Sequence, residues 1–408
     1  MRRLSIYIIL IGCINGFAHA QHHTIKTGSS LYLEAITVPS EKSAGSFYIS
    51  RIINYFPEQL TDPEAKKRHS YAQFGYIFPI SEFIEPGHFG QHSYGRPHRT
   101  EKNGSLYTCQ SGFIDFSHLR AALDWTVYLT FKILAEEKDF ELPPESGTLE
   151  LHFTNVDKLD IDDISSMAQR IAFERLAWHE VVSWHHHWPN HIMSEQLSAF
   201  TPEDIYSNSL GAVIGKNVAL RILNNVEVLS YSEVATEEIK KYILSLEPLN
   251  DKQGTIKAYN IVDLTRQQRL PQGEQNHDVW WESRIIFRDQ RYIFKRYMNI
   301  GPELEPWLVP NANTIGCETH EKTKILTVPQ QTKSGESFYN YYNFIITPDK
   351  KMFTDKGPIK HHHSGFEKFD TRDFEKVINV VSKEMEAILL PGFARRNNTA
   401  PSIVKKIK

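Results

Sequence analysis

The residues best suited to chemistry lie in "RLAWHEVVSWHHHWPNH", residues 175–191, where a His-Glu pair precedes a run of histidines. On a zincin helix, two histidines four residues apart bind Zn²⁺, and the Glu that follows the first one polarises water. His179 and Glu180 match the start of that pattern, but Ser183 stands where the second histidine belongs. A zincin helix is therefore not expected, and further ligands must come from other parts of the chain.

Hydrophobic periodicity predicts that His179 points into the protein. With residues 163–187 taken as a helix, the positions on its side of the helical wheel are mostly small or apolar. Arg175 lies one turn earlier on the same face. A buried guanidinium there requires a carboxylate partner, because an unpaired buried charge is costly.

A second block, "YTCQSGFIDFSHLRAALDWTVYL", predicts a helix that begins near Asp115, with His118 on the same face. The double alanine that follows would let another helix approach closely. One interpretation places Asp115 and His118 opposite His179, as a mixed His/carboxylate metal site. The other makes Asp115 the N-cap of the helix and His118 a core histidine.

A third block, "SAFTPEDIYSNSLG", begins with features typical of a helix start: a capping Thr, a Pro in the first turn, and two acids. A carboxylate there, Glu203 foremost, is also a candidate partner for Arg175 or a third metal ligand. Both interpretations remain open at this point. In the helix of the second block, Arg120 and Asp124 have the spacing of a surface ion pair.

Composition excludes several classes of protein. Apolar residues make up 40% of the 408 residues and aromatic residues 12%, which is unlike a disordered chain. A formal net charge of −3 provides no field that would attract nucleic acid, so we exclude that partner. The sequence contains no G-x-S-x-G, P-loop or dinucleotide-binding motif.

The first twenty residues are typical of a signal peptide, with a basic start, an apolar stretch and an A-x-A cleavage site. We therefore expect Gram-negative type export to the periplasm or the medium, with a mature chain that begins at Gln21. The alternative is a lipoprotein, because "LIGC" has the form of a lipobox that would place a lipid anchor on Cys13. No later stretch is long and apolar enough to predict a transmembrane segment.

Two cysteines, Cys109 and Cys317, follow the signal peptide. In an oxidising compartment, pairing is the default expectation, and the alternative is two buried free thiols. A disulfide across so long a loop would stabilise the fold by about 5 kcal/mol in the chain-entropy model.

The periodicity along the chain predicts an α+β fold with a central helical, bundle-like core flanked by short antiparallel strands and a C-terminal helix. The expected helices are 115–137, 163–187, 202–215, 232–246 and 371–390. The expected strands lie within 21–110, in a hairpin after 278, and at 324–329 and 338–347. The expected divisions are a signal peptide at 1–20, a main domain at 21–320, and a packed strand and helix extension at 321–408 with a basic tail at 395–408.

Together with "NIGPELEPWLVP", the three blocks resemble DUF4056, a bacterial family of exported proteins of unknown function. The likeness covers roughly residues 90–320. It implies an exported proteobacterial protein but no particular activity. It also implies that six residues belong to the family's motif blocks, namely Asp115, His118, His179, Glu180, Glu203 and Asp204.

These observations predict an exported metal-dependent hydrolase. His118 and His179 would hold Zn²⁺, with Asp115 or Glu203 as the third ligand. Glu180 would act as general base on a metal-activated water, with Arg175 beside it, and the substrate would be an envelope or extracellular amide or ester. The alternative is a non-catalytic periplasmic or envelope-associated protein, in which these His, Arg and carboxylate groups form a structural network. The distance between the two rings tests the metal site, because imidazoles of His118 and His179 well over 6 Å apart could not bind the same ion.

Overall fold

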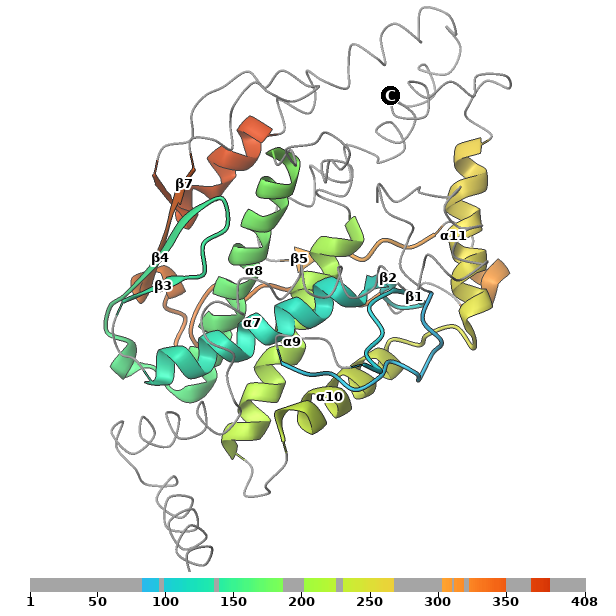
Figure 1. The fold of residues 1–408 in the computed structure, drawn as a ribbon, viewed down its shortest axis with the longest axis horizontal. Helices are drawn as coiled ribbons and strands as arrows, with labels where there is room; N and C mark the ends of the chain where they lie inside the picture. The colour runs from blue at the N-terminus through green and yellow to red at the C-terminus, as the bar shows by residue number, and fades with distance from the viewer. Residues whose placement is uncertain are drawn as a thin grey trace, which may run out of the picture.

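The computed structural model describes residues 83–94, 99–135, 139–185, 202–224, 230–267, 303–309, 312–318, 323–349 and 368–381. Within these ranges helices fill the centre and short antiparallel strands lie beside them (Figure 1). The predicted α+β fold is confirmed. The signal peptide with Cys13, the expected strands before residue 83, the hairpin after 278 and the basic tail lie outside the described residues.

Five helices carry most of the described structure: α7 (Phe116–Ala135), α8 (Ile161–His185), α9 (Pro202–Asn224), α10 (Tyr231–Ser245) and α11 (Lys252–Gln267). The first four correspond to the predicted central helices, although α9 extends well past its expected end. α11 is not predicted from the sequence, because its mean hydropathy is low and its first turn contains a glycine.

In the described part of the chain, antiparallel strands form three small sheets. A four-stranded sheet has the order β3 (Phe140–Leu142), β4 (Gly147–Phe153), β7 (Tyr342–Pro348) and β8 (Phe369–Asp370). The two pairs are β1 (Ser105–Thr108) with β2 (Gly112–Asp115), and β5 (Glu303–Leu304) with β6 (Leu326–Thr327). The expected C-terminal helix begins as the 3₁₀ turn Thr371–Asp373 and is helical over 374–381.

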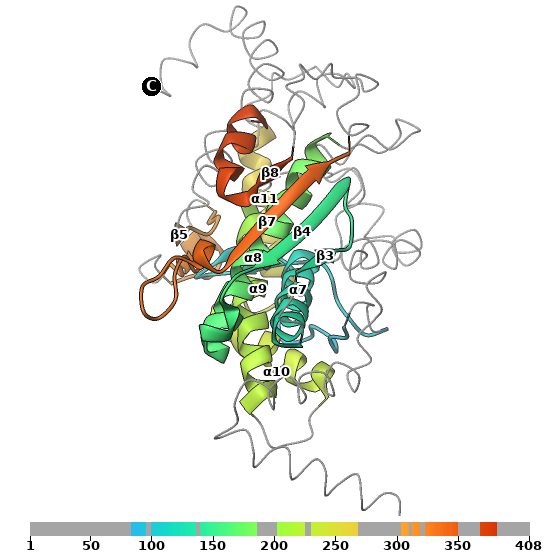
Figure 2. The same cartoon turned by 90° about the vertical axis from the view of Figure 1, so that its left-hand side faces the viewer.

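The sheet joins parts of the chain on both sides of residue 320. β4 pairs with β7 along seven residues, from Gly147 opposite Pro348 to Phe153 opposite Tyr342. Figure 2 shows the two strands side by side in front of the helices. The division at residue 320 remains a prediction, but the strands after it complete a sheet that begins before it.

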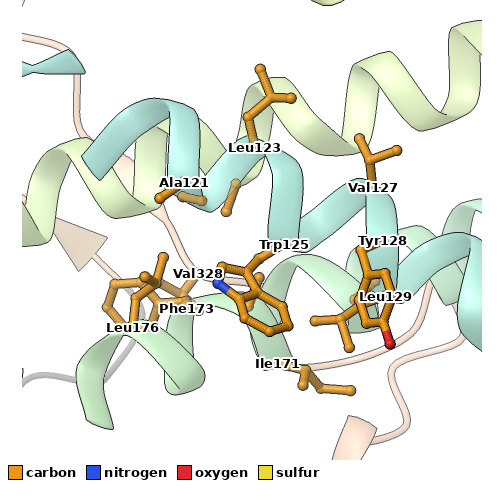
Figure 3. Close-up of a cluster of buried hydrophobic side chains, with 14 of the residues drawn as sticks. Ala121, Leu123, Trp125, Val127, Tyr128, Leu129, Ile171, Phe173, Leu176 and Val328 are labelled. Carbon is orange, nitrogen blue, oxygen red and sulfur yellow. The ribbon is translucent and has the colours of Figure 1, made fainter. Parts of the chain in front are cut away.

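Helix α7 lies at the centre of the hydrophobic core and is buried along almost its whole length. Figure 3 shows Trp125 and Leu129 of α7 pointing toward α8, where Ile171 lies opposite them. The same cluster continues through the inner face of the sheet. Polar residues on α7 are therefore inside the protein, whatever their position around the helix.

Two glycines of α9 allow it to lie directly against α7. A Cβ atom on Gly211 would lie only 2.0 Å from the carbonyl oxygen of Leu119. A Cβ atom on Gly215 would lie 2.7 Å from the carbonyl oxygen of Leu123. The double alanine contributes as expected, since Ala122 also faces Gly211. These contacts advance in the same direction along both helices, and the start of α7 lies beside the second turn of α9, where Ser207 and Asn208 contact Asp115 and His118.

The structure corrects the interpretation of Arg120 and Asp124 as a surface ion pair, because both residues are fully buried. Arg120 donates to the carbonyl oxygen of Phe89 at 2.6 Å and contacts Nδ1 of His92 at 3.1 Å. Asp124 accepts a hydrogen bond from the Tyr231 hydroxyl at 2.5 Å and contacts Nε2 of His92 at 2.9 Å. The spacing indicated which residues share a face of α7, but other segments cover that face.

Cys109 and Cys317 form a disulfide, with their Cα atoms 5.3 Å apart. The bond connects the turn between β1 and β2 to the segment after the 3₁₀ helix Ala312–Ile315. It therefore links two parts of the chain that are 208 residues apart in sequence.

In the part of the chain that the structure describes, none of the helices combines the length and the apolar character needed to cross a membrane.

Replacing Gly211 with Ala should lower the free energy of unfolding by about 2–3 kcal/mol, because the new methyl group forces α9 away from the backbone of α7. This loss exceeds the gain in helix propensity, which is about 1 kcal/mol. Urea denaturation measures the difference. Val213→Ala, at a half-buried position on the same helix, is the control and should cost less. A Gly211→Ala protein as stable as the wild type would contradict the close contact.

Candidate metal centre

His118, Glu180 and Asp204, which we call the triad, come together from three helices. One ligand atom from each residue lies within 4.8 Å of the other two. Nε2 of His118 is 3.5 Å from Oδ1 of Asp204, and Nδ1 is 3.9 Å from Oε1 of Glu180. Each of the three side chains is at most 2% exposed. An imidazole and two carboxylates in this arrangement are suited to holding a divalent cation.

The helix contacts explain why these three side chains meet. His118 is in the first turn of α7, and Asp204 is in the first turn of α9. Asp204 lies on the same stripe of α9 as Gly211 and Gly215, seven and eleven residues later. The close contact at the glycines therefore brings Asp204 beside His118. Glu180 enters from the C-terminal part of α8.

Asp115 caps helix α7. Its Oδ1 accepts hydrogen bonds from the backbone N–H groups of Ser117 at 2.7 Å and His118 at 3.1 Å. The backbone N–H of Asp115 in turn donates to Oγ of Ser207 on α9 at 2.9 Å. The structure thus gives Asp115 the capping role and does not place it in the triad.

Glu203 is buried at 4% exposure in the first turn of α9, but it is not part of the triad either. Its neighbour Asp204 takes that place. Consecutive residues on a helix point about 100° apart, so only one of the two acids faces His118. The sequence analysis favoured Glu203 in this helix turn, whereas the triad contains the neighbouring Asp204.

The carboxylate that Arg175 requires is Glu145, in the connection between β3 and β4. Glu145 forms a short ion pair with Nη1 of Arg175, and its Oε1 lies 2.5 Å from Nδ1 of His179. The indole N–H of Trp178 donates to the Glu145 carbonyl oxygen at 2.9 Å. Sequence reasoning missed Glu145, because "LPPESG" reads as a polar turn. In the sequence, the only indication of such a residue was that a buried Arg175 needs a carboxylate partner.

His179 lies beside the triad. Its ring centroid is 6.3 Å from that of His118, and Glu145 holds its Nδ1. That centroid separation does not by itself exclude a shared ion, but His179 is not among the residues whose ligand atoms all lie within 4.8 Å of one another. In this arrangement Glu180 supplies a ligand atom to the triad, and His179 does not.

The surroundings of His118 favour the neutral imidazole. Burial lowers its pKa, and the nearby His179 lowers it further, while Asp115, Glu180 and the hydrogen bond to Asn208 raise it; the net pKa is below the ordinary value. A neutral imidazole is the form that binds a metal ion.

The sequence matches a protein family of unknown function. The family model of DUF4056, a protein of unknown function, matches residues 77–310. The chain belongs to this family, and all three triad residues lie in the matched region.

One curated protein, methionine–tRNA ligase of Thermotoga maritima, is 19% identical to this chain over 268 residues. The match covers 51% of this chain and 42% of the ligase, so the chain spans less than half the length of that relative. No solved structure matches the chain.

Replacing Glu145 with Gln should destabilise the protein by about 3 kcal/mol near neutral pH, because it leaves the buried guanidinium of Arg175 without a counter-charge. Burial raises the pKa of Glu145, but Arg175 and His179 bring it down to about 2 from the ordinary 4.5. The stabilisation is therefore fully present above pH 4.5 and is lost as the pH falls toward 2.

Denaturation of both proteins across this pH range measures the effect, and the difference between them should shrink in acid. Glu141→Gln, at an exposed position in β3, is the matched control and should change stability little. A constant difference at every pH would refute the ion-pair explanation.

Proposed function

We propose that this protein is an exported metal-dependent hydrolase whose cation is held by His118, Glu180 and Asp204. The observation that carries the proposal is the convergence of these three buried side chains from α7, α8 and α9, with ligand atoms within 4.8 Å. Zn²⁺ is the first candidate, because it accepts imidazole nitrogen and carboxylate oxygen at similar bond lengths.

The charge of the triad supports a divalent cation. Two carboxylates would balance the charge of such an ion, and the imidazole of His118 would add a neutral donor. Residues around the triad hold its members in place: Asp115 caps the helix that carries His118, and Glu145 orients the residue next to Glu180. Such a supporting layer is typical of metal sites that keep a defined geometry.

Three protein ligands leave a coordination position for another molecule, which is typical of catalytic zinc sites. A cation bound here would supply Lewis-acid chemistry, polarising a water molecule or a substrate carbonyl. Because Glu180 belongs to the triad, we move the proton-transfer role from Glu180 to the neighbouring His179. Glu145 holds Nδ1 of His179, so Nε2 is the nitrogen that would exchange a proton.

We infer the class of substrate from the cellular compartment in which we expect the protein to act. The signal-peptide pattern supports export, and the disulfide between Cys109 and Cys317 is compatible with an oxidising compartment. We therefore propose an amide or ester of the cell envelope or its surroundings as the substrate.

One observation favours a second candidate, a non-catalytic envelope protein. Glu145 already binds both Arg175 and His179, so part of the buried polar group is held together by protein contacts alone. In that case the same residues serve stability, and the protein folds equally well without metal.

Metal analysis separates the two candidates. We expect the untagged protein, purified without chelator, to carry about one zinc ion, and His118→Ala and Asp204→Asn to abolish binding. His179→Gln should retain the metal, because His179 lies outside the triad. His88→Ala, at an exposed histidine, is the control. Wild-type protein that stays folded but takes up no added zinc would rule out the metal site and favour the structural network.

Catalysis is tested separately with the zinc-loaded protein and a panel of model esters and amides. We expect hydrolysis that a chelator and Asp204→Asn both abolish and that His179→Gln reduces by about 100-fold or more, the usual scale of acid–base catalysis. A zinc-loaded protein that hydrolyses none of them would count against the hydrolase and leave the metal site standing.

A further inference from the structure

We propose that Asn208 is a positioning residue that fixes the ring of His118 so that Nε2 is the nitrogen that faces the cation. The inference rests on the proposed metal site and assigns a role to a residue that the triad does not contain.

The contact that supports this role is buried. Oδ1 of Asn208 lies 3.1 Å from Nδ1 of His118, and both residues are 2% exposed. An amide oxygen only accepts hydrogen bonds, so Nδ1 of His118 must carry the proton and donate it. A neutral imidazole holds one proton, which leaves the lone pair on Nε2.

The geometry on the other side of the ring agrees with this assignment. Nε2 of His118 lies 3.5 Å from Oδ1 of Asp204. Two ligands of a tetrahedral zinc ion with bonds of about 2.1 Å are about 3.4 Å apart. The nitrogen that holds the lone pair is therefore already at ligand spacing from Asp204, while Oε1 of Glu180 lies 3.9 Å from the other ring nitrogen, Nδ1.

Helix α9 holds the start of α7 at two consecutive positions. Ser207 accepts the backbone N–H of Asp115, the residue that caps α7, and Asn208 accepts the ring N–H of His118. Asp204 lies one turn before Asn208, so one face of α9 supplies both a ligand and the group that orients its partner ligand. Hydrogen bonding to the remaining N–H of a ligand histidine is a usual way to fix its orientation.

Zinc affinity provides the first test, by competition with a chromophoric chelator. Asn208→Ala should weaken zinc binding by about 10–100-fold, which is the usual effect of removing such a partner. Asn208→Asp should restore most of the affinity, because it keeps an oxygen acceptor at the same place. Ser209→Ala, at the next buried position of α9, should leave the affinity unchanged.

Heteronuclear NMR of the imidazole nitrogens provides the second test, in both metal-free and zinc-loaded protein. Metal-free wild type should carry the His118 proton on Nδ1, and Asn208→Ala should give a mixture of tautomers. Thermal unfolding of each metal-free variant checks that the fold is intact. The NMR experiment reports the position of the proton directly and does not depend on zinc affinity. A variant that is less stable but still folded therefore still tests the proposal.

The outcomes distinguish the two proposals. A proton on Nε2 in metal-free wild type, or an Asn208→Ala protein that binds zinc as tightly as the wild type, overturns the role of Asn208. Wild type that carries the proton on Nδ1 but binds no zinc overturns the metal site, while Asn208 keeps its effect on the ring.

Discussion

The close contact between α7 and α9 is the constraint on which the candidate site depends. Gly211 and Gly215 bring the backbone of α9 to within van der Waals distance of the α7 backbone. A larger residue at either place would move the first turn of α9 away from His118. The distance between His118 and Asp204 therefore depends on two glycines that lie two to three turns beyond Asp204 along α9 and have no side chain to contribute to chemistry.

Buried charge is the second organising feature, and each charged group is matched by partners from distant segments. Glu174 of α8 pairs with Arg170 and also accepts hydrogen bonds from Tyr342 of β7 and Thr371. Arg175, the residue after Glu174, pairs with Glu145 from the β3–β4 connection. These pairs tie α8 to the sheet and to the β3–β4 connection, and the Arg175 guanidinium also lies 5.1 Å from the centroid of the Trp125 ring on α7. Glu180 is thus carried on a helix that several other elements restrain, which favours a fixed geometry at the triad.

The metal hypothesis and the structural hypothesis differ in what they require of the same residues. A structural network needs only that each buried polar group has a partner. A metal site also needs ligand atoms to converge on one point, and His118, Glu180 and Asp204 meet this further requirement. In the function that we propose, Glu180 is therefore a ligand, and His179, held by Glu145, is the group that would move a proton. The family match covers the three residues of the triad, but the family is one of unknown function.

The sequence by itself determined the features that depend on neighbouring residues. Periodicity located α7, α8 and α10 and the start of α9, and it placed His179 and Arg175 on an inward face. The same local reasoning identified Asp115 as a possible cap and showed that Arg175 needs a carboxylate. It did not find α11, because the residues that form it are polar on average and its first turn contains a glycine.

Only the tertiary structure decided which groups meet. Whether Glu203 or Asp204 faces His118 depends on how α9 is rotated against α7, and Glu145 reaches Arg175 from a turn that is 30 residues away. The burial of Arg120 and Asp124 likewise depends on segments that cover α7 from elsewhere in the chain. Helical periodicity fixes the angle between residues of one helix, whereas a metal site is defined by distances between helices, which arise only from their packing.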